Sequence, residues 1–315
     1  MTKENGGVKI LVTGGAGYIG TSLVPILLQR GYEVTILDTL MYGGTVLMPL
    51  FRCKDFHFIR GDIRDYNTVS DACQDKDIII HLAAIVGFPA CREDSELAHS
   101  TNVIGTRNIA KATQKGQYVL YSSTGSNYGA LLNDICTEET PLNPLSVYGK
   151  TKTEAEKIIM EETNCVAYRF ATGFGVSPRL RLDLLINEFC YQAVKQKYLV
   201  VYESNHMRTF IHVNDMARAF LFAIDHISMM SGHVFNVGSE ELNFSKRQIV
   251  ELIAKETGAY VHYADIGEDS DKRNYVVSYK KLNDTGFQIE NTIESGIKEL
   301  IRALGAIKTT TPLTN

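Results

Sequence analysis

A tyrosine and a lysine one helical turn apart are the first candidates for proton chemistry in this chain. Tyr148 and Lys152 lie in a segment whose pattern predicts a helix, so both side chains project from one face. A free tyrosine has a pKa of about 10, and acting as a base near neutral pH requires a depression of roughly 3 units, or about 4 kcal/mol. An adjacent ammonium supplies part of that stabilisation. The same spacing is common on surface helices, so other motifs must decide.

A glycine-rich turn near the N-terminus is suited to binding a diphosphate. In KILVTGGAGYIG, Gly14, Gly17 and Gly20 follow an expected strand and lead into a helix expected to start near Tyr18. A Cβ atom at Gly14 or Gly17 would block close approach of the backbone to a pyrophosphate, and the helix N-terminus offers free N–H groups. Asp38 ends the next expected strand, where a carboxylate accepts both hydroxyls of an NAD ribose and repels a 2′-phosphate. The pattern therefore predicts NAD rather than NADP.

Short β-branched segments alternate with helical patterns through the first half of the chain. Such alternation predicts an α/β fold of the Rossmann type, a doubly wound parallel sheet with helices on both faces. Ligands of these sheets bind at the carboxyl ends of the strands, where most candidate residues fall. The expected strands are Val8–Val12, Glu33–Leu37, Phe56–Ile59, Asp77–Leu82, Tyr118–Ser122 and Val166–Phe170, with helices such as Thr21–Arg30 and Tyr148–Glu162 between them.

The second half of the chain loses this regular alternation. Residues 1–170 are expected to form the cofactor domain, and residues 171–315 mainly a smaller C-terminal substrate domain. Residues 209–237 are expected to return to the first domain, with the strand–helix unit Thr209–His226 rejoining the sheet. The Thr-rich tail from Lys308 is expected to be disordered. The expected helices of this half are Asp183–Lys195 and Thr292–Leu304.

Composition and charge exclude several classes of function. The 315 residues carry a net charge of −4 with both signs well mixed, which argues against a nucleic-acid-binding surface. No apolar run approaches the roughly 18–20 residues of a membrane span, and the polar N-terminus does not resemble a signal peptide. The cysteines show no metal-ligand spacing and are expected to be free thiols of a cytoplasmic protein. They are Cys53, Cys73, Cys91, Cys136, Cys165 and Cys190.

A further motif, YSSTGSNYG at Tyr121–Gly129, follows the end of an expected strand upstream of the Tyr–Lys pair. With it, the chain resembles the extended short-chain dehydrogenase/reductase family, the NAD-dependent sugar-nucleotide epimerases and dehydratases. The resemblance covers nearly the whole chain. Its motifs occur in the family's order: TGGAGYIG, Asp38, GDIRD, HLAA, Asn102 in NVIGT, YSST, YGKTK and RTFIHVND.

The resemblance implies a role for each catalytic position. Thr124 matches the residue that hydrogen-bonds the reacting hydroxyl, and Tyr148 matches the base that removes its proton while hydride passes to nicotinamide. Lys152 matches the lysine that holds the nicotinamide ribose and lowers the tyrosine pKa. Asn102 matches a buried asparagine that supports the lysine, although a polar residue at a helix N-terminus explains it as well.

The resemblance also implies two sets of binding residues. Arg208 and Arg273 match arginines that bind the diphosphate of a nucleotide sugar, since a guanidinium binds phosphate oxygens bidentately. The expected cofactor residues are Gly14, Gly17, Tyr18, Ile19, Asp38, Asp62, Ile63, Leu82, Ala83, Ala84, Asn102, Ser122, Tyr148 and Lys152. The expected substrate residues are Val86, Gly87, Thr124, Ser126, Arg179, Arg181, Asn187, Arg208 and Arg273.

Departures from the family's patterns narrow the expected reaction. Related 4,6-dehydratases follow the threonine with Asp-Glu, whereas Gly125 and Ser126 follow Thr124 here, and neither replaces a carboxylic acid as proton donor. The family's epimerase-reductases prefer NADP, which Asp38 disfavours. The expected reaction is therefore oxidation of a sugar nucleotide at C4, ending in epimerisation or in release of the keto sugar. A 4,6-dehydratase, a reductase and a non-catalytic NAD-binding regulator remain the alternatives.

Three segments carry a finer resemblance. Ala83–Cys91, Ser177–Phe189 and Ile266–Ser278 are similar to bacterial GDP-heptose 4-dehydrogenases of capsule pathways, which implies a role in surface polysaccharide synthesis. The nucleotide base and the sugar stay open, because substrate loops vary within the family. The family also implies a homodimer, paired here through Ser100–Gln114 and Tyr148–Glu162.

Overall fold

The computed structural model describes residues 7–129, 135–264 and 276–307, and its largest element is a seven-stranded sheet. All neighbouring strands are parallel, in the order β11-β7-β5-β4-β1-β2-β3. The order in which the chain adds strands reverses between β1 and β4. Ligands of such sheets bind in the crevice at this point. The strands are β1 (Lys9–Thr13), β2 (Glu33–Asp38), β3 (Phe56–Arg60), β4 (Ile78–His81), β5 (Tyr118–Thr124), β7 (Cys165–Phe170) and β11 (Val234–Val237).

These strands confirm the predicted doubly wound α/β fold. All six expected strands are present, and their ends differ from the expected ones by no more than two residues. The central strands contain continuous apolar runs, as in Ile78–Ile80 of β4, because helices cover both faces of the sheet. Side chains of both faces are fully buried, including Ile10 and Val12 on one face and Leu11 on the other.

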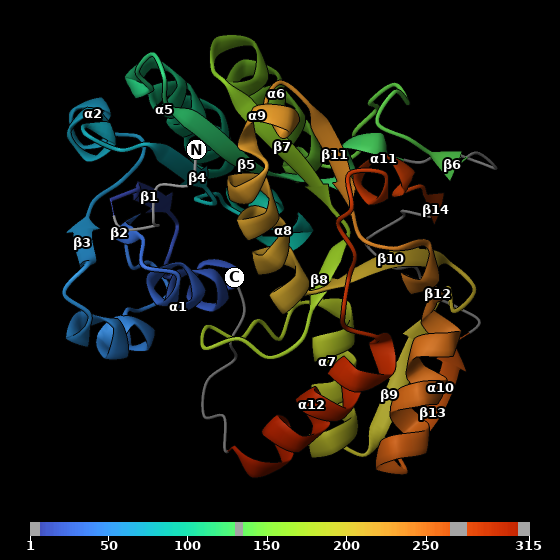
Figure 1. Ribbon diagram of the computed structural model, residues 1–315. Helices are drawn as coiled ribbons and strands as arrows, with labels where there is room; N and C mark the ends of the chain where they lie inside the picture. Colours follow the sequence, from blue (N-terminus) through green and yellow to red (C-terminus); the bar gives the residue numbers. More distant parts are fainter. Residues whose placement is uncertain (1–6, 130–134, 265–275, 308–315) are drawn as a thin grey trace.

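Two helical layers cover the sheet (Figure 1). On one face, α1 (Gly20–Gln29) and α8 (Val213–Asp225) pack side by side and contribute to one apolar cluster with the strands. On the other face, α2 (Tyr66–Cys73), α5 (Thr106–Ala112) and α6 (Val147–Glu162) form the second cluster. The expected helix Ser100–Gln114 is divided, because a π-helical segment, Ser100–Gly105, leads into α5.

The second lobe has its own apolar core beside the sheet (Figure 1). Its helices α7 (Leu185–Lys195), α10 (Lys246–Thr257) and α12 (Ile293–Ala306) pack on one another. A small sheet joins β8 (Thr172–Phe174), β10 (Met207–His212) and β12 (Asn243–Ser245), and a second one pairs β9 (Tyr198–Tyr202) with β13 (Tyr260–Ala264). The expectation that the strand at Thr209 rejoins the main sheet is therefore wrong. From residues 209–237, α8 and β11 return to that sheet, whereas β10 pairs with β8 and β12.

The remaining strands and α-helices of the described chain are short. They are β6 (Ile135–Cys136), β14 (Val276–Val277), α3 (Phe88–Glu93), α4 (Ser95–His99), α9 (Ile227–Met230) and α11 (Lys280–Asn283). All six cysteines are free thiols, and all but Cys53 are buried. Within the described ranges, no helix has the length and apolar character that crossing a membrane requires. The predictions for Arg273, for most of Ile266–Ser278 and for the tail from Lys308 fall outside these ranges.

The glycine turn between β1 and α1 is held by backbone packing. Gly14 has a φ of +70°, and a Cβ atom added there would lie 2.7 Å from the backbone N and Cα of Ala83, in the loop after β4. Gly14 N–H donates to the carbonyl of Leu37 at 2.9 Å. The neighbouring loop alone therefore disfavours a side chain at position 14, whether or not a pyrophosphate is bound.

Gly14→Ala should destabilise the fold more than a glycine replacement that meets no neighbour. Gly31 is the matched control, since its φ is +83° and a Cβ atom added there has nothing within 4 Å. We expect Gly31→Ala to lower the free energy of unfolding by about 1 kcal/mol, and Gly14→Ala to lower it by about 1–3 kcal/mol more. Urea unfolding of both variants measures the difference. Equal losses would show that Ala83 yields without cost.

Candidate active site

A cavity of about 710 Å³ opens at the carboxyl ends of the central strands, between the sheet and the second lobe. This volume is within the range of small-molecule and cofactor sites. Twenty of the expected site residues line it. They are Gly14, Gly17, Tyr18, Ile19, Asp38, Asp62, Ile63, Leu82, Ala83, Ala84, Val86, Gly87, Ser122, Thr124, Ser126, Tyr148, Lys152, Arg179, Arg181 and Arg208.

Asp38 connects the end of β2 to the glycine turn. Its carboxylate accepts hydrogen bonds from Ala16 N at 3.0 Å and from Leu40 N at 2.8 Å. Burial raises the pKa of Asp38, and these two hydrogen bonds oppose the rise. Each carboxylate oxygen keeps a second lone pair directed for another donor, which fits the ribose hydroxyls of NAD. With the bare glycine turn and the N-terminus of α1 beside it, this cradle fits a dinucleotide.

Asp62 and Ile63 lie beside this cradle but are held differently. The Asp62 carboxylate pairs with Arg64 at 2.6 Å, and the hydrogen bonds from the Arg64 guanidinium lower the pKa of Asp62. Ile63 is buried, and its carbonyl accepts a hydrogen bond from Asn108 at 3.0 Å. Arg64 therefore sets the orientation of the Asp62 carboxylate on this side of the cavity.

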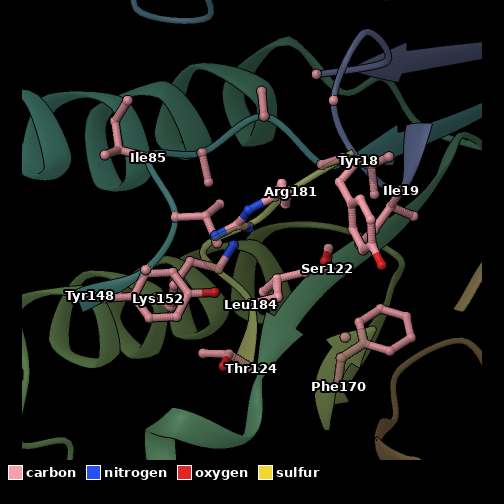
Figure 2. Close-up of a pocket in the computed structure, with 18 of the residues that line it drawn as sticks. Tyr18, Ile19, Ile85, Ser122, Thr124, Tyr148, Lys152, Phe170, Arg181 and Leu184 are labelled. Atoms are coloured by element: carbon pink, nitrogen blue, oxygen red, sulfur yellow. The ribbon is translucent and has the colours of Figure 1, made fainter. Parts of the chain in front are cut away.

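Thr124, Tyr148 and Lys152 converge from two elements (Figure 2). Thr124 ends β5, and its hydroxyl accepts a hydrogen bond from Ser126 N at 3.1 Å. Tyr148 lies in the first turn of α6, where Ser146 caps the helix by accepting from Gly149 N at 3.0 Å. Figure 2 shows the three side chains together at one side of the cavity, with Tyr18, Ile19 and Phe170 at the other.

The Lys152 ammonium is held in a buried place. The residue is 3% exposed, and its Nζ lies 4.1 Å from the centroid of the Tyr121 ring. Burial lowers the pKa of Lys152 to about 7, and the carboxylate of Glu156 opposes that change. Near neutral pH the group is therefore close to the balance between its charged and neutral forms.

Asn102 supports this region without lining the cavity. It is 1% exposed, and its amide bonds both backbone groups of Ile85, accepting from N at 2.8 Å and donating to O at 3.0 Å. The same amide donates to Thr151 Oγ1 at 3.0 Å, next to Lys152 in α6. Asn102 therefore joins the loop after β4 to the helix that carries the Tyr–Lys pair.

Three of the four expected arginines line the cavity from the second lobe, and the fourth, Arg273, lies outside the described residues. Arg181 pairs with Asp183 at 2.5 Å, and its guanidinium lies between the Lys152 and Tyr18 sides of the cavity in Figure 2. Arg179 lies over the Tyr42 ring, 4.9 Å from its centroid. Arg208 is 4% exposed and donates to the carbonyl of Met207 at 3.0 Å. Three arginines thus line one cavity, and guanidinium groups are well suited to binding phosphate oxygens.

Asn187 occupies a different place from the expected one. It is fully buried and does not line the cavity. Its amide accepts from Gly175 N at 3.0 Å and donates to the carbonyl of Arg181 at 2.8 Å. Asn187 therefore holds the segment that presents Arg181, because its polar atoms are directed to backbone.

Sequence reasoning missed several residues that line the cavity. Tyr42 follows Asp38 closely in the chain, and its aromatic ring was the available signal for a stacking role. Asp183, two residues after Arg181, had the spacing of a local ion pair. Phe170, Gly173 and Glu188 also line the cavity, and no spacing in the sequence indicated them. In the described part of the chain, no cluster of His, Cys, Asp and Glu could hold a metal ion.

Lys152→Met should stabilise the fold at low pH. The folded-state pKa of Lys152, about 7, is below the ordinary value of 10.5, so the buried ammonium costs stability in full below pH 7. That cost falls as pH rises from 7 toward 10.5, where the unfolded chain alone binds the proton. The advantage of the variant should therefore shrink by up to about 1 kcal/mol per pH unit above pH 7. Urea unfolding between pH 6 and pH 9 measures it, and a constant advantage would contradict this account.

Comparison with known proteins supports the same kind of site as the geometry. The profile of the NAD dependent epimerase/dehydratase family matches residues 10–238. The low-salt glycan biosynthesis protein Agl12 of Haloferax volcanii is 30% identical over 305 residues, covering 93% of this chain and 97% of that protein.

Solved structures show the same fold along nearly the whole chain. The UDP-glucose 4-epimerase of Thermus thermophilus in complex with NAD has a TM-score of 0.83 at 26% identity, with 95% of this chain and 100% of that chain covered. The UDP-glucuronic acid 4-epimerase of Bacillus cereus in complex with UDP-glucuronic acid and NAD has a TM-score of 0.84 at 25% identity, with coverages of 94% and 99%. This chain belongs to the NAD-dependent epimerase/dehydratase family of enzymes, which act on nucleotide sugars with NAD as cofactor.

Proposed function

We propose that this enzyme oxidises a nucleotide-linked sugar at C4, as a 4-epimerase or a 4-dehydrogenase. The observation that carries the proposal is the shared cavity: Thr124, Tyr148 and Lys152 line one side, and Arg179, Arg181 and Arg208 reach it from the second lobe. A sugar placed between these two groups has its hydroxyls at the Tyr–Lys pair and its diphosphate at the guanidinium groups. NAD, when bound along the glycine turn, supplies the hydride acceptor.

Each catalytic side chain has one task in this proposal. Tyr148 removes the proton from the sugar hydroxyl, and Thr124 hydrogen-bonds the same oxygen and fixes its position. Lys152 binds the nicotinamide ribose, and its ammonium favours the phenolate form of Tyr148. The Asn102 amide holds α6 and the loop of Val86 and Gly87 in a fixed relative position, so that the base and the sugar remain aligned.

The binding residues divide between the two lobes. Residues 1–170, with α8 and β11, form the cofactor domain, and residues 171–315 otherwise bind the substrate. Gly14, Gly17, Asp38 and Ser122 belong to the NAD site in this proposal. The diphosphate is bound by Arg208 and by Arg179 or Arg181, while Arg273 is a proposed further ligand in a segment outside the described residues.

The residues after Thr124 favour oxidation over dehydration. Gly125 and Ser126 offer no carboxyl group there, and the Ser126 backbone N–H donates to the threonine hydroxyl. Elimination of water needs a proton donor and a base beside the sugar C5 and C6, in addition to the hydride transfer. Such a pair is missing from these two positions, so we propose no dehydratase activity.

A finer proposal concerns the substrate. The segments Ala83–Cys91 and Ser177–Phe189 resemble GDP-heptose 4-dehydrogenases, which supports a GDP-heptose. The similarity to a glycan biosynthesis protein supports a place in surface polysaccharide synthesis. We propose both together, and a cytoplasmic location follows from the nucleotide-sugar substrate.

A panel of UDP-, GDP-, CDP- and TDP-sugars, with GDP-heptose included, tests the reaction. NADH absorbance and product mass are followed together. An unchanged mass without net NADH indicates epimerisation, and a product two hydrogens lighter indicates a 4-keto sugar. Tyr148→Phe should lower turnover by about 10²–10⁴-fold while NAD binding is retained. A product lighter by one water, or a Tyr148→Phe variant with full turnover, would overturn the proposal.

We also propose a homodimer paired through α6 and the Ser100–Ala112 helical segment. Ile104 in that segment is 40% exposed, and α5 packs beside α6. Sedimentation velocity at micromolar concentration should show a dimer. Ile104→Glu should shift the population toward monomer, because a charge in an apolar interface is desolvated without a partner. A wild-type monomer at these concentrations would contradict the proposal.

A further inference from the structure

Glu156 lies directly behind the Tyr–Lys pair. It follows Lys152 by one turn of α6 and is 4% exposed. Arg169 donates to both of its carboxylate oxygens, with a shortest distance of 2.6 Å. Ser123 Oγ donates to the same carboxylate at 2.5 Å, and Asn127 Nδ2 does so at 3.1 Å. The ion pair with Arg169 and the hydrogen bonds from Ser123 and Asn127 fix this buried carboxylate in place.

The partners of Glu156 come from the strands that form the floor of the site. Ser123 on β5 and Arg169 on β7 are register partners, and Ser123 precedes Thr124. The carboxylate therefore binds α6, which carries Tyr148, to the strand end that carries Thr124. Arg169 extends the network by donating to the Tyr128 hydroxyl at 3.1 Å.

Three further titratable groups lie around Lys152, and burial keeps each of them in its neutral form near pH 7. Burial lowers the pKa of His81, on β4, to about 3, and its ring nitrogens lie within hydrogen-bonding distance of two threonine hydroxyls. Burial raises the pKa of Cys91, on α3, to about 11. Burial also raises the pKa of Tyr121, on β5, so its ring offers only a π-face to the ammonium. Of these groups and Glu156, only Glu156 forms an ion pair, with Arg169.

We propose that Glu156 is a positioning residue that keeps Lys152 in its ammonium form beside Tyr148. This inference rests on the proposed roles of Tyr148 and Lys152, and it adds the group that sustains them. Lys152 needs such support because burial lowers its pKa to about 7. A change of one unit in that pKa alters the ratio of ammonium to neutral amine tenfold. Arg169 fixes the carboxylate but also places a second cation nearby. Loss of Glu156 therefore removes the anion and leaves the Arg169 charge uncompensated.

The test measures the titration of Tyr148 directly and needs no sugar substrate. The ultraviolet absorbance of tyrosinate is followed against pH in the NAD-loaded protein, and the signal of Tyr148 is isolated by subtracting the Tyr148→Phe variant. Glu156→Gln should raise the midpoint by about one pH unit, because a less charged Lys152 stabilises the phenolate less. Glu156→Asp keeps the charge and should return most of the way to wild type. Glu154→Gln, an exposed glutamate on the same helix, is the control and should leave the midpoint unchanged.

Two further variants separate the possible failures. If Glu156→Gln does not fold, the double variant Glu156→Gln/Arg169→Gln replaces the ion pair by two neutral amides. It should show a smaller upward shift, because the Arg169 cation is removed together with the anion. Lys152→Met should raise the midpoint in every case. A raised midpoint in Lys152→Met with an unchanged midpoint in the folded Glu156 variants overturns this inference alone. An unchanged midpoint in Lys152→Met overturns the proposed Tyr–Lys pairing, and the inference with it.

Discussion

The site depends on holding a positive charge where water is largely excluded. Lys152, which the proposed mechanism places beside Tyr148 and the nicotinamide ribose, lines the cavity with 3% of its surface exposed. Desolvation disfavours the ammonium there, and its pKa falls to about 7. The surrounding fold offsets that effect with a tyrosine ring face at 4.1 Å and a carboxylate one helical turn away.

This requirement explains why the polar core lies under α6. A buried Glu156 alone would be as costly as a buried Lys152 alone, so the carboxylate is paired with Arg169 and hydrogen-bonded to Ser123 and Asn127. The network crosses β5 and β7 and reaches Asn236 on β11 through the Tyr128 hydroxyl. The hydrogen bonds that fix α6 against the sheet therefore also connect the strands β5, β7 and β11 to one another.

The second lobe closes the cavity through its connection to the glycine turn. The Tyr18 hydroxyl donates to the Gly175 carbonyl at 2.8 Å, and Ser177 Oγ donates to the Tyr18 carbonyl at 2.7 Å. These bonds fix the segment that continues into Arg179 and Arg181 over the N-terminus of α1. The glycine turn and the arginines proposed to bind the substrate are thus aligned by hydrogen bonds between segments that are far apart in the sequence.

The sequence by itself determined the α/β fold, the strand positions, the NAD turn with Asp38, and the residues at the carboxyl ends of the strands. Local periodicity and motif spacing encode these features, because each depends on residues close together in the chain. Tertiary structure decided the rest. In the folded structure β10 belongs to a separate sheet, and Asn187 bonds backbone groups instead of lining the cavity. Glu156 pairs with Arg169 and accepts a hydrogen bond from Ser123. Those outcomes depend on strand pairing and burial between distant segments, which no local pattern in one sequence specifies.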